Sequence, residues 1–278
     1  MNALRKHHRL SVLLKIAGLA RSTFYYQVAA SKAEDRHGEL KARIAHIYAR
    51  HKGRYGYRRI TAALRQSGIW VNHKTVQRLM AVLQLKSLVR PKRYRSYRGE
   101  VGRVAPNLLQ RRFEATKPNE KWVTDVTEFS VGGKKLYLSP VLDLYNGEII
   151  AWQTSERPDF ALVRGMLDKA LRRLRPDEAP MLHSDQGWAY QMTAYRQKLA
   201  SRGLRQSMSR KGNCLDNAAM ESFFGTLKSE YFRLGRFSDV DQLRRGIAEY
   251  IRYYNHDRIK LKLEGLSPVQ YRTQPRAA

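Results

Sequence analysis

The chain has 278 residues, of which 42% are hydrophobic, and this content can bury one sizeable core with one or two small satellite domains. Its formal net charge of +29, from 53 Lys and Arg against 24 Asp and Glu, exceeds what solubility requires and indicates a polyanionic partner, nucleic acid first. A single cysteine, Cys214, excludes an internal disulfide and a thiolate zinc site. No apolar run reaches the roughly 18 residues of a membrane span, so we expect a cytoplasmic protein without a membrane partner.

Residues 1–30 contain a short pair of predicted helices. The stretch SVLLKIAG has helical periodicity and Gly18 can end it, while Ser22 can cap the following stretch, STFYYQV. The pattern predicts a small helix-turn-helix-like segment, although a plain helical hairpin would have the same pattern.

Residues 31–88 give a stronger pattern, with a helix at about 38–51, a second that stops near Gly68, and a third that Asn72 can cap. Four apolar residues of the third helix share one face: Val76, Leu79, Met80 and Leu83. Three long polar side chains point the other way: Lys74, Gln77 and Arg78. In a helix-turn-helix, the second helix of the pair, which is the third helix of this region, typically presents such donors to the major groove from its exposed face. We therefore predict a helix-turn-helix DNA-binding domain, with a solvated helix face as the alternative.

Residues 89–117 have the composition of a basic linker. Arginines alternate there with Tyr94 and Tyr97, while nothing apolar repeats. Three of them are candidate DNA contacts: Arg93, Arg95 and Arg98. A charge run is often only solvated, but one that joins two nucleic-acid-binding parts favours contact with a phosphate backbone, with the rings able to stack on bases.

From residue 118 to 235 the pattern changes to strands and helices. Three β-rich runs are separated by the hairpin signals Gly132-Gly133 and Asn146-Gly147. Two further strands alternate with helices at about 159–175, 188–201 and 216–232. The order βββαβαβα predicts an α/β domain with a mixed five-stranded sheet. The crossover rule lets the fourth strand return beside the first, which gives the strand order 3-2-1-4-5, and a C-terminal helical tail covers residues 236–278.

Three carboxylates of this region are candidates for chemistry. Asp125 lies in the middle of the predicted first strand, where aspartate packs badly, Asp185 ends the fourth strand, and Glu221 begins the last helix. The switch point between strands one and four is where α/β sheets bind ligands. Oxygen donors without cysteine suit Mg²⁺ or Mn²⁺, and two such ions can assist in-line phosphoryl transfer. Pairing of Asp125 with an arginine is the structural alternative.

Four stretches carry a resemblance to a known family: WVTDVTEF, LHSDQGW, GNCLDNAAMESFFGTLKSE and YYNHDRIKLKLEGLSPVQYR. They resemble the second-frame (OrfB) transposases of the insertion-sequence-three family, in particular its one-fifty subgroup, which belong with retroviral integrases to the DDE superfamily. The resemblance covers essentially the whole chain. It implies a ribonuclease H-like catalytic core preceded by small all-α helix-turn-helix regions.

The resemblance also implies the roles of particular residues. Asp125, Asp185 and Glu221 match the family's catalytic acidic triad, which would hold two Mg²⁺ or Mn²⁺ ions. Lys228 matches a basic residue that contacts DNA near the reacting phosphate, and its spacing of seven from Glu221 independently places both on one helix face. The implied reaction is attack by water at an element end to free a 3′-OH, followed by attack of that hydroxyl on another phosphodiester.

The implied partners are double-stranded DNA at element ends and target, and further copies of this chain on DNA. The product of an upstream reading frame (OrfA), fused to this frame by frameshifting, is a further one. No coiled-coil heptads are evident, so we expect modest specificity and poor transposition from this chain alone, in association with the bacterial nucleoid. A DNA-binding regulator with an inactive core and a stand-alone nuclease are the alternative functions.

Other polar residues of the core are expected to be mainly structural. Asp143 precedes a hairpin, and Glu128 has the strand parity opposite to that of the first carboxylate, so it should face away. Asp216 and Asn217 are predicted to cap the last helix. His183 either orients a metal ligand or is a satisfied core histidine.

Overall fold

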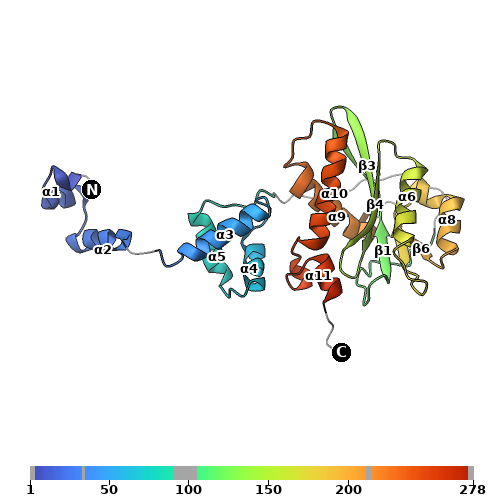
Figure 1. Cartoon of the computed structure of the whole chain (residues 1–278), viewed down its shortest axis with the longest axis horizontal. Helices are drawn as coiled ribbons and strands as arrows, with labels where there is room; N and C mark the ends of the chain where they lie inside the picture. The colour runs from blue at the N-terminus through green and yellow to red at the C-terminus, as the bar shows by residue number, and fades with distance from the viewer. Residues whose placement is uncertain (1–3, 33–34, 90–104, 211–213, 275–278) are drawn as a thin grey trace.

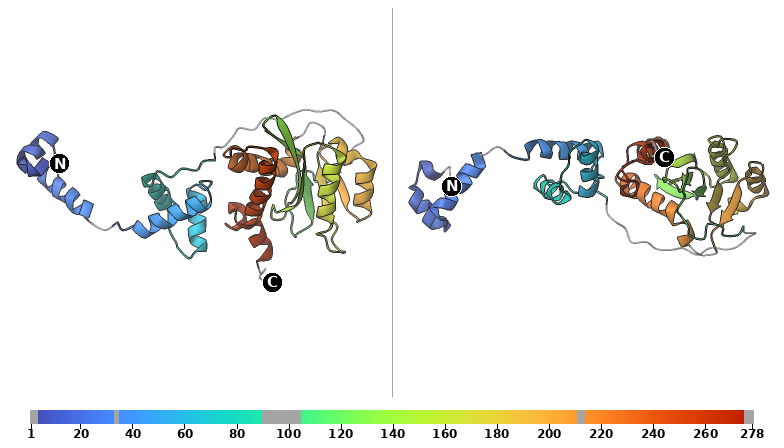
Figure 2. Two further views of the ribbon diagram at one scale, coloured as in Figure 1. Left: turned by 45° about the horizontal axis from the view of Figure 1, so that its top comes forward. Right: turned by 90° about the horizontal axis from the view of Figure 1, so that it is seen from below.

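The computed structural model describes residues 4–32, 35–89, 105–210 and 214–274. Figure 1 shows two short N-terminal helices, then a group of three helices, then an α/β core, arranged along one long axis. The last helices of the chain lie between the three-helix group and the sheet, as the additional views in Figure 2 also show.

The N-terminal segment consists of a 3₁₀ turn, η1 (Leu4–Lys6), and helices α1 (Leu10–Ala17) and α2 (Arg21–Lys32). Gly18 ends α1 with a left-handed backbone at φ +62°, as the sequence predicted. Helix α2 begins at Arg21, so Ser22 lies inside the helix and the predicted cap is wrong.

The three-helix group consists of α3 (Gly38–Arg50), α4 (Tyr57–Gln66) and α5 (His73–Val82). The Asn72 side chain accepts a hydrogen bond from the Lys74 backbone N–H (2.8 Å), which confirms the predicted cap of α5. Three residues of the predicted apolar stripe are buried in a core formed by Ile44, Tyr55, Ile60, Leu64, Val76, Leu79 and Met80, and the fourth, Leu83, is partly buried against it. Ile259, from the C-terminal tail, completes the same core.

In the described residues the sheet has six strands: β1 (Lys121–Thr124), β2 (Thr127–Val131), β3 (Lys134–Asp143), β4 (Ile149–Ser155), β5 (Met181–Ser184) and β6 (Arg205–Met208). The long strand β3 pairs with β4 on one side and with both β1 and β2 on the other, all antiparallel. Strand β1 pairs in parallel with β5, and β5 in parallel with β6. The predicted strand order is confirmed, with the predicted first strand divided into β1 and β2.

The division of the first strand corrects the expected position of Asp125, which follows β1 instead of lying within a strand. The register of β3 is the same on both sides of the break and would place Pro140 opposite Asp125. The Pro140 carbonyl faces β1, because it accepts from the Thr124 hydroxyl (2.8 Å). A residue in an antiparallel ladder directs its N–H and carbonyl to the same side, but proline has no N–H to donate. Pairing therefore stops at Asp125.

Helices cover both faces of the sheet (Figure 1). One face packs against α6 (Phe160–Leu171), α7 (Trp188–Gln191) and α8 (Thr193–Ala200), and the other against α9 (Ala218–Leu227) and α10 (Val240–His256). Neighbouring residues of β1 serve the two layers, since Trp122 packs with α6 and Val123 with α9 and α10. The helix predicted at 188–201 is two helices, because the backbone at Met192 is extended (φ −61°, ψ 139°).

The described residues after the sheet pack on the cores of the sheet and of the three-helix group. The 3₁₀ turn η2 (Cys214–Asn217) precedes α9, and the π-helix η3 (Lys228–Phe232) follows it directly, so the helix predicted at 216–232 has three parts. After α10 come the 3₁₀ turn η4 (Leu261–Leu263) and α11 (Pro268–Thr273), which begins with a capping box of Ser267 and Gln270. No helix in the described ranges is long and apolar enough to cross a membrane.

Candidate active site

Two aspartates lie at the same edge of the sheet because their strands are parallel neighbours. In the β1–β5 ladder Val123 pairs with His183. Asp125 comes directly after the last residue of β1, and Asp185 directly after the last residue of β5. The carboxyl ends of adjacent parallel strands are where α/β sheets bind ligands. The structure therefore brings these two predicted site residues together.

Helix α9 brings the third carboxylate to this edge. The Asn217 side-chain amide, at the start of α9, donates to the Thr124 carbonyl oxygen (3.1 Å) at the end of β1. Glu221 lies in the first turn of α9, half-buried beside the apolar residues that anchor the helix. The predicted capping role of Asn217 is wrong, since its side chain makes no cap hydrogen bond. It instead joins α9 to the strand that carries Asp125.

The electrostatics of Asp125 report the proximity of the three carboxylates. Burial raises the pKa of Asp125, the negative charges of Asp185 and Glu221 raise it further, and the positive charge of Lys228 lowers it. Burial also raises the pKa of Asp185. The described residues contain no group of three or more His, Cys, Asp or Glu that could hold a metal ion. The three carboxylates are thus electrostatic neighbours without forming a ligand shell.

The loop after β5 fixes the orientation of Asp185. The Gly187 backbone N–H donates to Asp185 Oδ1 (2.9 Å), and a side chain at Gly187 would place its Cβ 2.9 Å from the same oxygen. The same added Cβ would lie 3.3 Å from a ring carbon of Tyr190. Only glycine lets the carboxylate and the ring approach this closely. The sequence SDQGWAY therefore holds one carboxylate in a defined direction.

Lys228 lies where α9 passes into the π-helix, so the predicted single helix changes its winding there. Its ammonium group lies over the ring of Phe129, 5.4 Å from the centroid. Its positive charge lowers the pKa of Asp125, so Lys228 lies within electrostatic reach of that carboxylate. Gly225, between Glu221 and Lys228, is exposed and would have no atom within 4 Å of an added Cβ. There is therefore open space beside this position of the helix.

His183 and Asp216, which lie near the site, make structural contacts. His183 is fully buried, and its ring nitrogens contact Ser207 Oγ (2.8 Å) and Ser209 Oγ (3.1 Å). Burial lowers the pKa of His183 to about 4, so the ring is neutral at ordinary pH and is a satisfied core histidine. Asp216 does not cap α9, because its carboxylate accepts from Arg210 (3.0 Å) and Arg111 (2.9 Å).

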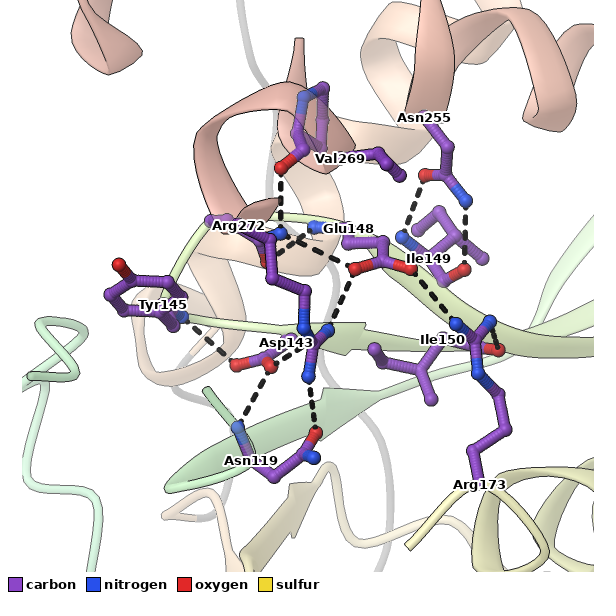
Figure 3. Close-up of polar contacts among 12 residues, drawn as sticks. Asn119, Asp143, Tyr145, Glu148, Ile149, Ile150, Arg173, Asn255, Val269 and Arg272 are labelled. Carbon is purple, nitrogen blue, oxygen red and sulfur yellow. Dashed lines mark hydrogen bonds and ion pairs between the residues drawn. The ribbon is translucent and has the colours of Figure 1, made fainter. Parts of the chain in front are cut away.

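Asp143 and Glu128 have the structural roles that the sequence predicted. Asp143 is fully buried and accepts from the backbone N–H groups of Asn119 (2.9 Å) and Tyr145 (3.0 Å), with Arg272 at 3.5 Å (Figure 3). Glu128 is exposed and pairs with Lys135 (3.2 Å). Neither carboxylate belongs to the candidate site.

The candidate DNA-binding residues of α5 lie on its exposed face: Lys74, Gln77 and Arg78. The opposite face of α5 is buried, as the apolar spacing predicted. Arg78 approaches the His37 ring, with 3.4 Å between Nη2 and Nε2. The three linker candidates, Arg93, Arg95 and Arg98, lie outside the described residues.

The class of protein follows from comparisons with known proteins. Residues 115–214 match the family described as "Integrase core domain", residues 221–275 match a second family of that description, and residues 34–93 match "HTH-like domain". A chain of the simian T-cell lymphotropic virus intasome in complex with PP2A regulatory subunit B56 gamma has a similar fold. Its TM-score is 0.52 at 18% identity, with 84% of this chain and 76% of that chain covered. The fold is an integrase-type, ribonuclease H-like core with a helix-turn-helix-like region before it.

Relatives that match along nearly the whole chain give the family. The candidate transposase InsK for insertion sequence element IS150 of Escherichia coli (strain K12) is 57% identical over 274 residues, covering 99% of this chain and 97% of the relative. The candidate transposase for element IS1353 of Shigella flexneri is 42% identical over 98% of this chain, which covers 54% of that relative. The chain belongs to the insertion-sequence transposases, as its sequence motifs predicted.

Proposed function

We propose that this transposase cleaves and joins DNA strands with Mg²⁺ or Mn²⁺, two ions per site, held by Asp125, Asp185 and Glu221. The observation that carries the proposal is the position of Asp125, whose ionisation is opposed by burial and by the charges of the other two carboxylates. Carboxylates that repel one another favour a bound cation, and three oxygen donors without a thiolate suit a hard divalent ion. Bound there, such ions would activate an attacking oxygen and stabilise the leaving one.

The chain's own groups would orient the reacting phosphate. Backbone N–H groups hold the two aspartates, from Val126 to Asp125 (2.7 Å) and from Gly187 to Asp185 (2.9 Å). Lys228 would offset phosphate charge beside Glu221, and the open surface at Gly225 would admit the DNA backbone. Water would attack first to free a 3′-OH, and that hydroxyl would attack the second phosphodiester, so no covalent protein–DNA intermediate is required.

The binding of DNA would be divided between the two parts of the chain. Lys74, Gln77 and Arg78 would contact the major groove through the exposed face of α5. The linker arginines Arg93, Arg95 and Arg98 would follow the phosphate backbone. The high net charge of +29 supports a large electrostatic contribution to affinity.

A strand-transfer assay with a labelled element end tests the reaction. We expect the wild-type chain to nick and join the DNA with Mg²⁺, and to do neither when EDTA replaces the metal. Glu221→Gln should abolish both steps while it still binds DNA, and Glu128→Gln is the matched control, since Glu128 is an exposed carboxylate paired only with Lys135 in the described chain. Specific DNA binding with no cleavage by the wild type would instead favour a regulator with an inactive core.

We further propose that several copies assemble on DNA and that a fused upstream segment completes the enzyme, in association with the nucleoid. The Shigella flexneri relative supports the fusion, because this chain covers only 54% of its length. Assays of paired-end complexes and circles with this chain and with the fusion, at equal concentration, test the idea. Equal circle formation by both proteins would contradict it.

A further inference from the structure

A buried glutamate lies directly after the candidate catalytic helix. Glu230 belongs to the π-helix η3 and is 2% exposed. Its carboxylate accepts two hydrogen bonds from Arg258 (2.8 and 2.7 Å), one from Arg59 (3.1 Å) and one from the Tyr250 hydroxyl (3.0 Å). A carboxylate buried this deeply is stable only when hydrogen-bonded cations surround it.

Two of the arginines around Glu230 come from the helix-turn-helix region. Arg59 lies in α4, and Arg54 lies in the turn before α4. The Arg54 side chain is buried, donates from Nε to the Glu230 carbonyl oxygen (2.9 Å), and lies over the rings of Tyr253 (4.8 Å) and Tyr250 (5.4 Å). The three-helix group is thus fixed to η3 and α10 by directional contacts.

The tail after α10 adds further contacts to the same region. The Tyr55 hydroxyl accepts from the Ile259 backbone N–H (2.8 Å) and donates to the Asp257 carbonyl (3.3 Å). Gln66 Nε2 donates to the Gly265 carbonyl (2.7 Å). The side chain of Ile259 is buried in the core of the three-helix group. This part of the tail therefore belongs structurally to both regions.

The far end of the tail is fixed to the sheet. Figure 3 shows Arg272 of α11 reaching Glu148 (2.7 Å), Asp143 (3.5 Å) and Asn119 (3.0 Å) at the β3–β4 end of the sheet. One continuous segment, from Arg258 to Arg272, thus contacts the three-helix group near its start and buried carboxylates of the sheet at its end.

The position of Glu230 links this joint to the chemistry. Glu221, Lys228 and Glu230 lie on one uninterrupted helical segment, since η3 continues directly from α9. Glu230 lies nine positions after Glu221, a rise of about 14 Å at helical spacing. The same segment carries a candidate catalytic carboxylate at one end and the attachment of the DNA-reading helices at the other.

We propose that Glu230 is the joint of a rigid coupling between the helix-turn-helix region and the catalytic core, with Arg54, Arg59 and Arg258 as positioning residues. The coupling fixes the distance between the DNA segment bound by α5 and the phosphate that is cleaved at the candidate active site. The inference rests on the proposed function for what the two ends bind. Apolar packing also joins the two regions, but hydrogen bonds to charged groups add a geometric requirement that favours one relative orientation.

Arg59→Gln, alone and with Arg54→Gln, tests the joint, because both changes remove the helix-turn-helix side of the network and leave the pair of Glu230 and Arg258 intact. Arg58→Gln is the matched control, since Arg58 lies on the same helix and contacts only Tyr57 among the described residues. In the full chain with Cys214→Ser, spin labels at Arg65→Cys and Arg164→Cys report the distance between α4 and α6. Both label positions are exposed.

We expect one narrow distance distribution in the parent and the Arg58→Gln chain, and a distribution at least twofold broader with Arg59→Gln or the double change. On a labelled element end, the parent should cut one phosphate at a fixed distance from the DNA protected by the protein. The joint variants should cut several neighbouring phosphates at a similar summed rate. A loss of stability alone would lower the amount of active protein without spreading the cuts.

Narrow distances in both joint variants, or cuts confined to one phosphate despite broadened distances, would overturn the inference and leave the proposed function intact. If the parent fails to cleave with Mg²⁺, the proposed function is wrong, and the distance measurement still decides whether Glu230 is a joint. If the double variant does not fold, Arg59→Gln alone decides, because Arg59 is a partly exposed member of the network.

Discussion

Two sets of carboxylates in this protein have opposite surroundings. Asp143, Glu148, Asp216 and Glu230 are at most 3% exposed, and each forms an ion pair with at least one arginine. Asp125 and Asp185 receive hydrogen bonds from backbone N–H groups of their own loops, and within the described ranges neither makes an ion pair. The first set is paired with cations that stabilise the fold, whereas in the second set the charge of Asp185 raises the pKa of Asp125.

The difference does not come from a shortage of cations. The chain has 53 Lys and Arg for 24 Asp and Glu, so an arginine partner for Asp125 would be easy to supply. Like charges kept together at a sheet edge destabilise the folded protein, and such local strain is typical of a functional site. The comparison therefore separates carboxylates that serve stability from those that we propose serve chemistry, and it makes opposite predictions for their removal.

The largest effect is expected for Asp125→Asn. The change removes a proposed metal ligand and one charge of a repelling set, so strand cleavage should fall by roughly 10³-fold or more while the melting temperature stays equal or rises by a few degrees. Cleavage of a labelled element end and thermal unfolding without metal measure the two quantities. A clear loss of stability in Asp125→Asn would move Asp125 into the structural set.

Arg272→Gln should have the opposite profile. Arg272 is the cation that Asp143 and Glu148 share in Figure 3, and its loss leaves two buried carboxylates without that partner. We expect the free energy of unfolding to fall by about 3–5 kcal/mol, measured by urea denaturation. Arg173→Gln is the control, because Arg173 pairs with Glu148 from a position where 54% of its side chain is exposed, and its loss should cost less than about 1 kcal/mol.

The sequence predicts much of the fold around the candidate site because local pattern controls it. Asp185 follows a short buried strand, and the order of the strands follows from the crossover rule. In the three-helix group, Asn72 precedes an apolar helical pattern and caps that helix. The break beside Asp125 was not predicted, although Pro140 inside a predicted inner strand was a usable signal, since proline in a sheet marks an edge or an irregularity.

The joint and the anchoring of α9 could not be predicted, because they depend on contacts between residues far apart in the chain. Glu230 and Arg59 are separated by 171 positions, and Asn217 and Thr124 by 93. In sequence, Glu230 resembles an ordinary surface residue of an amphipathic helix, and Asn217 resembles a helix cap. Only the packing of the three-helix group and the tail against the core gives either residue its role.

A smaller effect is expected for Asp216→Asn, and it should depend on pH. Burial opposes ionisation of Asp216, but hydrogen bonds and charge from Arg210 and Arg111 outweigh it and hold the pKa of Asp216 below its ordinary value of 3.8. A carboxyl group whose pKa is lowered by folding adds stability above its unfolded pKa and loses it as the pH falls.

At pH 6 we expect Asp216→Asn to be about 2 kcal/mol less stable than the wild type, from the loss of charged hydrogen bonds. The gap should narrow steadily as the pH falls below about 4, because the unfolded chain then binds a proton at Asp216 that the folded chain, with its lowered pKa, does not yet bind. Urea denaturation of both proteins between pH 6 and pH 3 measures the gap. If the difference in free energy of unfolding does not change with pH, Asp216 stabilises the protein through packing and not through its charge.

The smallest effects are expected for exposed charges that we propose contact DNA. Lys74→Gln and Arg78→Gln should each leave the melting temperature unchanged, since both side chains lie on the exposed face of α5. Each should weaken DNA binding a few-fold and reduce the slope of log affinity against log salt by about 0.9, the value for one phosphate contact.

Arg43→Gln is the control, because Arg43 lies on α3 and pairs with Glu39 (2.8 Å). Binding of a labelled element end at several salt concentrations gives the slopes. If the control lowers the slope as much as the α5 variants do, the helix-turn-helix region binds DNA through its overall charge, and α5 is not the reading helix.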